Sequence, residues 1–316
     1  MNILCTGLTG NLGQEIAKDL NSRNHKIYAI TRDKSKLKKY KVKINTVIEH
    51  DLLSDNELEV NFAIDCIVHC AGNVHFRDTG NDNEKMALQL IKLAKQKRIP
   101  LFLVSTAYIY RPDNNITTFN NAYEQDKYNA EQQLINSGLK YGIFRPSILV
   151  GNSKTGEIHT MSGYYSIVKA LYLALSILKS KKQKIRFPKL NGKSNLVPID
   201  QAAFHIGEEI DKQNFKTHYI TNPKPPDASW VLSETLNYFG LSEQLELIDL
   251  SFEQFTKIDL SIEEQKMYKF ISHYYPYLIL NTSFPTTICI ENLINHNYLQ
   301  NTLKYLKQSG FLKYDK

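Results

Sequence analysis

The sequence predicts an α/β fold in which helices cover both faces of a doubly wound parallel sheet. In the first half of the 316-residue chain, short apolar runs alternate with longer helix-patterned stretches, which is typical of βαβ units. The apolar runs are continuous and do not alternate with polar residues, which indicates strands buried on both faces. A glycine-rich segment follows the first run, where such folds place a tight strand-to-helix turn.

The elements of the first half follow in order along the chain. The expected strands are rich in valine, isoleucine and leucine, and they are Met1–Cys5, Lys26–Thr31, Ile44–Ile48, Cys66–Cys70, Leu101–Ser105 and Tyr141–Arg145. Apolar residues recur at helical spacing between them, most clearly in Asn11–Ser22, Asn81–Gln96 and Tyr123–Asn136. Together these elements predict a nucleotide-binding type of core.

The pattern changes after about Gly151. A long amphipathic stretch, Met161–Ser180, is followed by helical patterns at Trp230–Phe239, Ile262–Ser272 and Ile290–Gln308. We therefore expect residues 1–155 to form the core and residues 156–316 to form a smaller, mostly helical substrate-side portion. Some strands of that second portion are expected to return to the main sheet.

Composition excludes several broad classes of protein. Hydrophobic residues make up 42% of the chain and charged residues 22%, which are values of a globular protein and not of a disordered one. Thirty-nine basic residues against 32 acidic ones give a net charge of +7. This modest excess suits a site for phosphates or an acidic partner, but it is too small for a nucleic-acid-coating protein.

Cysteine and apolar patterns predict a reduced, cytoplasmic protein. Cys5, Cys66 and Cys70 lie inside apolar runs, where buried reduced thiols are expected, and no spacing suggests a metal site. The N-terminus lacks the pattern of a secretory signal. The most membrane-like run, Tyr164–Leu178, contains Lys169 and is too short to span a bilayer, so we expect no membrane span.

The segment TGLTGNLG, residues 6–13, predicts a dinucleotide site. Three glycines spaced GxxGxxG let the backbone turn tightly and approach a pyrophosphate, while the next helix supplies free N–H groups and its positive dipole end. Its place between a first strand and a helix is the context that supports this interpretation. The residues expected to contact the cofactor here are Gly7, Thr9, Gly10, Asn11, Leu12 and Gly13. The sheet is accordingly of the Rossmann type.

Arg32 ends the second strand, where an acidic residue would hold the ribose 2′-hydroxyl of NAD. Together with Lys34 and Lys36, it favours the 2′-phosphate of NADP through charge-assisted hydrogen bonds. A solvated basic helix start is the alternative, and the neighbouring Asp33 adds a negative charge. We expect NADP(H) as the cofactor, with NAD(H) as the second choice.

Two later strand ends are expected to border the adenosine half of the cofactor. Asp51, with its neighbour Leu52, closes an apolar run. Its carboxylate is placed either to bind the adenine amino group or to cap a following helix. Cys70, Ala71 and Gly72 end the fourth strand with small residues, which let the backbone pass close to the cofactor.

Tyr123 and Lys127 form a YxxxK pattern on a predicted helix. Residues four apart share a helix face, so the phenol and the ammonium can point into one cleft. A nearby ammonium lowers a tyrosine pKa by stabilising the phenolate, and this predicts acid–base chemistry. Thr106, at the end of the preceding strand, is the hydroxyl expected to bind the substrate oxygen, with Ser105 as the alternative.

Taken together, these segments resemble the extended branch of the short-chain dehydrogenase/reductase superfamily, and within it the thioester-reductase or male-sterility-type NAD-binding family. The segments that carry the resemblance are TGLTGNLG, AITRD, HDL, VHCAGNVHF, VSTAYIY, YEQDKYNAE, FRPSILVGNSKTGE and NLVPID. They occur in the expected order over about the first 200 residues, ending at Asp200. Beyond that point the resemblance fades, in the region where such proteins define their substrates.

The resemblance implies roles for particular residues. Thr106, Tyr123 and Lys127 would form the catalytic triad, and Asn83 falls at the family's helix asparagine position. Arg145, Pro146 and Ser147 would line the nicotinamide side, and Val74 and His75 would border the same pocket. One departure is Met86-Ala87, which stands where the family usually has a small pair.

The function expected from these features is NADPH-dependent reduction of an acyl thioester, bound to CoA or to an acidic carrier protein, to an aldehyde. Reduction of a free ketone or aldehyde, epimerase-type chemistry on a sugar nucleotide, and a non-catalytic dinucleotide sensor remain as alternatives. The aromatic run His273–Tyr277 either floors an apolar substrate pocket or belongs to the core. No oligomeric state is predicted.

Overall fold

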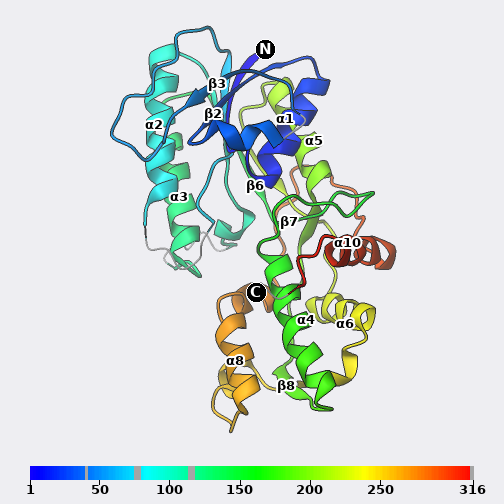
Figure 1. Cartoon of the computed structure of the whole chain (residues 1–316). Coiled ribbons are helices and arrows are strands. Elements are labelled where there is room, and N and C mark those ends of the chain that lie inside the picture. Colours follow the sequence, from blue (N-terminus) through cyan, green and yellow to red (C-terminus); the bar gives the residue numbers. More distant parts are fainter. Residues whose placement is uncertain (40–41, 75–79, 113–117, 314–316) are drawn as a thin grey trace. The chain divides into compact units, whose positions relative to one another are not determined.

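The computed structural model describes residues 1–39, 42–74, 80–112 and 118–313 (Figure 1). The chain divides into two compact units, and each is described below by itself. Unit 1 consists of Met1–Leu149, Ile199–Thr221 and Phe284–Ile290. Unit 2 consists of Val150–Pro198, Asn222–Ser283 and Glu291–Lys316.

Unit 1 is built on a parallel sheet, which confirms the predicted fold class. In the described residues the sheet has seven strands in the order β10-β6-β5-β4-β1-β2-β3, and neighbouring strands all run parallel. The order runs outward from β1 in both directions, which makes the sheet doubly wound. The strands are β1 (Asn2–Thr6), β2 (Lys26–Thr31), β3 (Ile44–Glu49), β4 (Cys66–His69), β5 (Leu101–Val104), β6 (Tyr141–Pro146) and β10 (Thr217–Ile220).

Two pairs of helices cover this sheet. One pair is α1 (Asn11–Ser22) with α5 (Ile199–Asp211), and the other is α2 (Asp82–Lys97) with α3 (Ala122–Ile135). Figure 1 shows the two pairs on opposite sides of the strands. Because both faces are covered, β1, β4 and β5 are mostly apolar and almost wholly buried, and they share a buried core with α2 and α3. Two short 3₁₀ turns, η1 (Lys34–Lys39) and η2 (Ala107–Ile109), complete unit 1.

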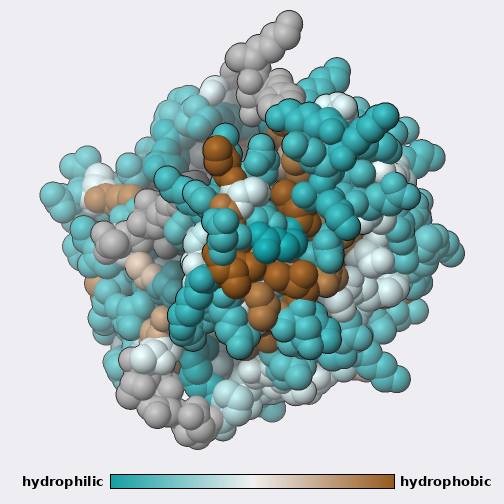
Figure 2. Space-filling view, turned by 90° about the horizontal axis from the view of Figure 1, so that it is seen from below, coloured by the Kyte–Doolittle hydropathy of each residue, from teal (hydrophilic) through white to brown (hydrophobic). Residues whose placement is uncertain are grey.

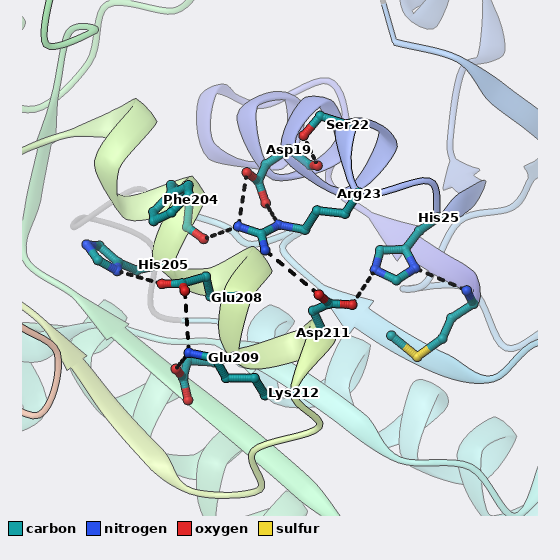
Figure 3. A network of polar contacts seen from close by, with 11 residues as sticks. Asp19, Ser22, Arg23, His25, Phe204, His205, Glu208, Glu209, Asp211 and Lys212 are labelled. Atoms are coloured by element: carbon teal, nitrogen blue, oxygen red, sulfur yellow. Dashed lines mark hydrogen bonds and ion pairs between the residues drawn. The ribbon is translucent and has the colours of Figure 1, made fainter.

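A polar network joins α1 to α5 (Figure 3). The Asp19 carboxylate pairs with Arg23 Nε at 2.6 Å, and it lies so close to α5 that a Cβ on Gly207 would be 1.8 Å from its Oδ2. Asp211 contacts both His25 Nε2, at 3.0 Å, and Arg23 Nη1, at 3.9 Å. Burial raises the pKa of Asp19, against the smaller lowering effect of Arg23. Glycine at position 207 is therefore a condition for this close packing.

Unit 2 is mostly helical. Its helices are α4 (Tyr164–Ser180), α6 (Ala228–Phe239), α7 (Phe252–Phe255), α8 (Ile262–Ile271), α9 (Tyr275–Leu278) and α10 (His296–Gln308), with the turn η3 (Ser242–Gln244). The short strands are β8 (Ile185–Pro188), β9 (Leu196–Pro198) and β11 (Leu245–Ile248), while β7 (Ile148–Val150) spans the change of unit. Strands β8 and β11 pair in parallel, and apolar side chains of α4, α6 and α8 pack beside them.

Helix α10 begins later than the sequence predicts. We expected a helix over Ile290–Gln308, but α10 starts at His296 because the Asn295 side chain accepts a hydrogen bond from the Tyr298 N–H, at 3.0 Å. Such an N-cap ends the preceding extended segment. The apolar residues before it, such as Ile290 and Ile294, are buried without being helical.

Tyr275, in the aromatic run His273–Tyr277, belongs to the apolar core of unit 2, whereas His273 is exposed. Tyr275 is 5% exposed, and its ring stacks on Phe252 with centroids 3.7 Å apart. This favours the core interpretation over the pocket interpretation for that residue.

On the face drawn in Figure 2, apolar side chains gather in one place among polar ones. In the described ranges, no helix combines the length and apolarity needed to cross a bilayer.

Candidate active site

The glycine-rich turn after β1 is tightly packed. Gly7 has φ +73, in the left-handed region that favours glycine, and a Cβ there would lie 2.5 Å from the backbone of Cys70 and Ala71. A Cβ on Gly13 would lie 2.2 Å from the Gly7 carbonyl oxygen. The first and third glycines are therefore required by the contact between the β1 and β4 ends and by the approach of α1.

The N-terminus of α1 fits a phosphate group. Gly10 is the N-cap, and no side-chain cap or acidic first-turn residue is found for this helix within the described residues. The N–H groups of the first turn thus carry a partial positive charge that no carboxylate of that turn neutralises. The predicted contact residues Thr9, Asn11 and Leu12 lie at this turn. The tight backbone turn at Gly7 and the free N–H groups of the first turn of α1 together suit the binding of a pyrophosphate.

Thr6, which the sequence analysis did not single out, ties the end of β1 to the end of β4. Its hydroxyl oxygen accepts the N–H groups of Cys70, at 3.2 Å, and Ala71, at 3.1 Å. The hydroxyl hydrogen is then left for His69 Nδ1, at 2.7 Å. Burial lowers the pKa of His69 to about 3, so this histidine is neutral.

The structure brings Tyr123 and Thr106 together. Thr106 is buried just after β5, Tyr123 lies in the first turn of α3, and their hydroxyls are hydrogen-bonded. Burial raises the pKa of Tyr123, and the smaller effect of Thr106 lowers it. The sequence pattern led us to expect that Lys127 lowers this pKa, but the groups that act on it here are Thr106 and Glu124. The phenol is therefore protonated at neutral pH.

Lys127 lies one helical turn after Tyr123 and is buried, with 5% exposure. Its Nζ donates to the Val104 carbonyl oxygen at 3.2 Å, and a Cβ on Gly72 would lie 2.8 Å from the same Nζ. Burial lowers the pKa of Lys127, while Cys70, Asp126 and Glu131 raise it. The ammonium therefore lies between the end of β5 and the segment that follows β4.

A buried ion pair next to Tyr123 has no counterpart in the sequence analysis. Glu124 is fully buried and accepts from Arg111 Nη2 at 3.1 Å. The other N–H groups of Arg111 donate to the carbonyl oxygens of Tyr108, Tyr110 and Thr118. This arrangement fixes the chain on both sides of residues 113–117. The only sequence signal for this ion pair is the presence of two opposite charges 13 positions apart.

Arg145 and Ser147 differ in whether their hydrogen-bonding groups are already occupied by other residues. The Arg145 guanidinium pairs with Glu131 through Nε at 3.0 Å and Nη2 at 2.5 Å, and it also donates to the Tyr219 hydroxyl. Its donors are thus engaged within unit 1. By contrast, the buried hydroxyls of Ser147 and Ser105 have no hydrogen-bond partner among the described residues. A buried polar atom without a partner is costly, which suits a ligand polar group at this sheet edge. Pro146, which lies between Arg145 and Ser147 in the sequence, is the last residue of β6.

The basic residues Arg32 and Lys34, expected at the adenosine end, lie at the surface. Arg32 is exposed, and no ion pair joins it to another residue in the ranges that the structure describes. Asp33 accepts from the Ser35 N–H at 2.9 Å and from its hydroxyl, so this carboxylate is occupied locally. Lys34 pairs with Glu49 at 3.4 Å. Of Arg32 and Lys34, Arg32 is therefore the cation more available to a 2′-phosphate.

Asp51 is partly occupied as well. Its Oδ1 accepts the Leu53 N–H at 3.0 Å, and the segment it opens is a turn and not the helix that we considered. The neighbouring Leu52 is buried. His75 lies outside the described residues. Within the parts that the structure does describe, no group of three or more His, Cys, Asp and Glu side chains could hold a metal ion.

Comparisons with known proteins identify the family and the fold of this chain. The family described as NAD(P)H-binding matches residues 7–168. A search of curated protein sequences finds no significant match. Among solved structures, the chain is similar to the thiolation-reductase di-domain of an archaeal non-ribosomal peptide synthetase, with TM-score 0.73 and 18% identity over 99% of this chain and 76% of that one.

Two further solved structures have the same fold. The terminal R domain of the myxalamid PKS-NRPS pathway has TM-score 0.74 and 20% identity, over 100% of this chain and 92% of that one. A UDP-galactose 4-epimerase has TM-score 0.60 and 13% identity, over 98% of this chain and 99% of that one. At these identities the likeness establishes the fold alone.

Proposed function

The chain belongs to the NAD(P)H-binding family, and from this we propose that it is an NADPH-dependent reductase that converts an acyl thioester to an aldehyde. The observation that carries the proposal is the hydrogen-bonded pair Tyr123 and Thr106, with buried Lys127 one turn further along α3. This set lies on the same unit as the glycine turn.

Each residue has a chemical role in this proposal. The bound nicotinamide supplies the hydride that reduces the carbonyl carbon. Tyr123 donates its proton to the carbonyl oxygen, and the Thr106 hydroxyl binds the same oxygen as negative charge develops on it. Lys127, whose ammonium lies beside Gly72 in the segment expected along the cofactor, would bind the nicotinamide ribose. For a thioester, the resulting hemithioacetal collapses to aldehyde and free thiol.

The protonation state of Tyr123 favours the reductive direction. Because burial raises its pKa, the phenol holds its proton at neutral pH and is ready to act as an acid. An oxidation that begins with removal of a proton from an alcohol would instead need the phenolate first. This protonation state is the one that a proton donor to the substrate carbonyl oxygen needs.

The thioester substrate and the NADPH preference rest on separate observations. Two of the similar structures are reductase domains of carrier-linked synthetases, and the likeness runs over nearly the whole of this chain. We propose an acyl group carried on CoA or on the phosphopantetheine of an acidic carrier protein, to which the net charge of +7 is suited. Exposed Arg32, with Asp33 turned to Ser35, supports NADPH over NADH.

A spectrophotometric assay tests the proposal. Purified protein is mixed with NADPH and a panel of acyl-CoA thioesters, then with aldehydes, and finally with NAD and UDP-sugars. Loss of NADPH absorbance with thioesters, with aldehyde as product, supports the proposed reaction. Turnover of aldehydes or ketones alone would move the function to carbonyl reduction, and epimerised sugar would move it to the epimerases. Binding of NADPH with no turnover on any arm would leave the dinucleotide-sensor alternative.

A further inference from the structure

Asp126, which lies between Tyr123 and Lys127 in the sequence, makes its hydrogen bonds with a different helix. It is 5% exposed, and its Oδ2 accepts from the Asn83 backbone N–H and from Asn83 Nδ2, both at 2.8 Å. Its Oδ1 accepts from the Glu84 N–H at 3.0 Å. The carboxylate of α3 thus caps the N-terminus of α2.

This cap replaces the usual local one. Asn81 is the N-cap of α2, and no side-chain cap bond is found for it in the described part of the chain. The free N–H groups of Asn83 and Glu84 are satisfied by Asp126, and a carboxylate is the group that the positive end of a helix favours. The bonds join residues 42 and 43 positions apart, so they set how α2 and α3 lie against each other.

The same carboxylate determines the orientation of the Asn83 amide. An ionised carboxylate only accepts hydrogen bonds, so the amide must present Nδ2 to Asp126. Its Oδ1 then faces the other way and accepts the Asn73 N–H at 3.0 Å, while Nδ2 also donates to the Asn73 carbonyl oxygen at 3.1 Å. A flipped amide would lose these bonds.

The chain of contacts ends at the proposed catalytic lysine. Asn73 follows Gly72, where a Cβ would lie 2.9 Å from Asn83 Oδ1 and 2.8 Å from Lys127 Nζ. The segment Cys70–Asn73 is therefore held between the Asn83 amide and the Lys127 ammonium. Cys70, Ala71 and Gly72 of this segment are the residues that the sequence predicts along the cofactor.

We infer that Asp126 is a positioning residue: through Asn83 it holds the segment Cys70–Asn73 against Lys127 and so sets the place of the ammonium and of the cofactor. The inference rests on the proposed function, which it deepens. Buried negative charge on Asp126 also helps Lys127 stay protonated, since it raises a pKa that burial lowers.

The test uses Asp126→Asn, which keeps size and one acceptor oxygen but removes the charge and one acceptor. We expect weaker NADPH binding in fluorescence titration and a fall in kcat on the order of 10–100-fold, as for small misplacements of catalytic groups. The alkaline limb of the kcat profile should move to lower pH, because the pKa of Lys127 falls further without the anion. The backbone amides of Asn73 and Asn83 should exchange hydrogen faster.

Asn295→Ala is the matched control, because it removes the N-cap of α10 in unit 2, where the side chain accepts from Tyr298. It should lower stability without changing NADPH affinity or the pH profile. If Asp126→Asn fails to fold, Asn83→Ala serves instead. It leaves the two backbone bonds to Asp126 in place and removes the side-chain bonds of Asn83, both the one to Asp126 and those to Asn73. It should weaken NADPH binding.

Outcomes separate the inference from the proposed function. An Asp126→Asn protein that matches Asn295→Ala in NADPH affinity, amide exchange and pH profile would overturn the positioning role. A wild-type protein that reduces no carbonyl would overturn the proposed function. In that case the titration and the amide exchange still decide the role of Asp126.

Discussion

At the scale of single residues, the proton on Tyr123 is the feature on which the proposed chemistry depends. Tyr123→Phe removes the proton donor while keeping the ring. We expect kcat to fall by roughly 10²–10⁴-fold, the usual contribution of a general acid, with NADPH affinity little changed. Steady-state kinetics and a fluorescence titration measure the two quantities.

Tyr128→Phe on the same helix is the matched control, because it deletes a hydroxyl that the proposed mechanism does not use. Its kcat should stay at the wild-type value. Full turnover by Tyr123→Phe would contradict the assignment of the proton donor and would revive the sensor alternative.

Arg32 decides the cofactor preference in our proposal. Arg32→Ala should weaken NADPH binding by about 10–100-fold, which corresponds to a charge-assisted hydrogen bond of about 1.5–3 kcal/mol. NADH affinity should not change, since NADH lacks the 2′-phosphate. Lys34→Ala, whose ammonium pairs with Glu49, is the control and should change the NADPH affinity less. Equal losses for both nucleotides after Arg32→Ala would count against a 2′-phosphate contact.

The candidate site was predictable where residues act through local spacing, and less so where they act across the fold. Tyr123 and Lys127 could be paired because residues four apart share a helix face. Their placement after a strand ending in Thr106 could also be read from the chain. The bond between Asp126 and Asn83 could not, because it joins side chains 43 positions apart and no pattern marks either residue as a cap.

At the scale of elements, the close packing of α1 on α5 gives a prediction for Gly207. In Gly207→Ala the new methyl would lie 1.8 Å from Asp19 Oδ2, so either the helices separate or Asp19 leaves Arg23. We expect a loss of about 1–3 kcal/mol in the free energy of unfolding, as for other overpacked sites. Urea unfolding measures it.

Asp19→Ala provides the matched background. Without the carboxylate the clash disappears, so Gly207→Ala should be neutral or stabilising there, because alanine favours a helix over glycine by about 1 kcal/mol. The same loss in both backgrounds would show that the contact with Asp19 is not its cause.

Element ends were predictable where a local signal marks them. The bounds of α1 and β2 agree with the sequence pattern. Gly10 marks the residue before α1, and the run KIYAIT coincides with β2. Helix α10 starts six residues after the predicted Ile290, since apolar spacing continued through a buried extended segment before the Asn295 cap. Strand β10 lies on the edge of the sheet beside β6, a pairing between residues 74 apart that no local pattern encodes.

At the scale of the whole molecule, acid pH acts through carboxylates whose pKa the fold lowers. Glu264 is the clearest case, and it lies in unit 2 with 4% exposure. Its carboxylate accepts from the Arg186 backbone N–H, from Arg186 Nε and Nη2, each at 2.8 Å, and from the Ser261 N–H at 2.9 Å. These bonds, those of the Arg186 side chain first, lower the pKa of Glu264 from 4.5 to about 2.

A group whose pKa is lower in the folded than in the unfolded state stabilises the fold above its unfolded pKa. The contribution of Glu264 is therefore complete above pH of about 4.5 and is lost as the pH falls toward 2. Glu264→Gln should lower the urea midpoint of unit 2 at pH 7, and the difference from wild type should shrink as the pH falls below about 4.5. Trp230, the chain's one tryptophan, lies in α6 of unit 2, so its fluorescence follows this unfolding.

Glu253→Gln is the matched control. It changes the net charge equally but breaks only the exposed pair with Lys257, so its urea midpoint should stay near that of wild type at pH 7 and at pH 3. A gap between Glu264→Gln and wild type that is the same at pH 7 and pH 3 would mean that the charge of Glu264 does not stabilise unit 2.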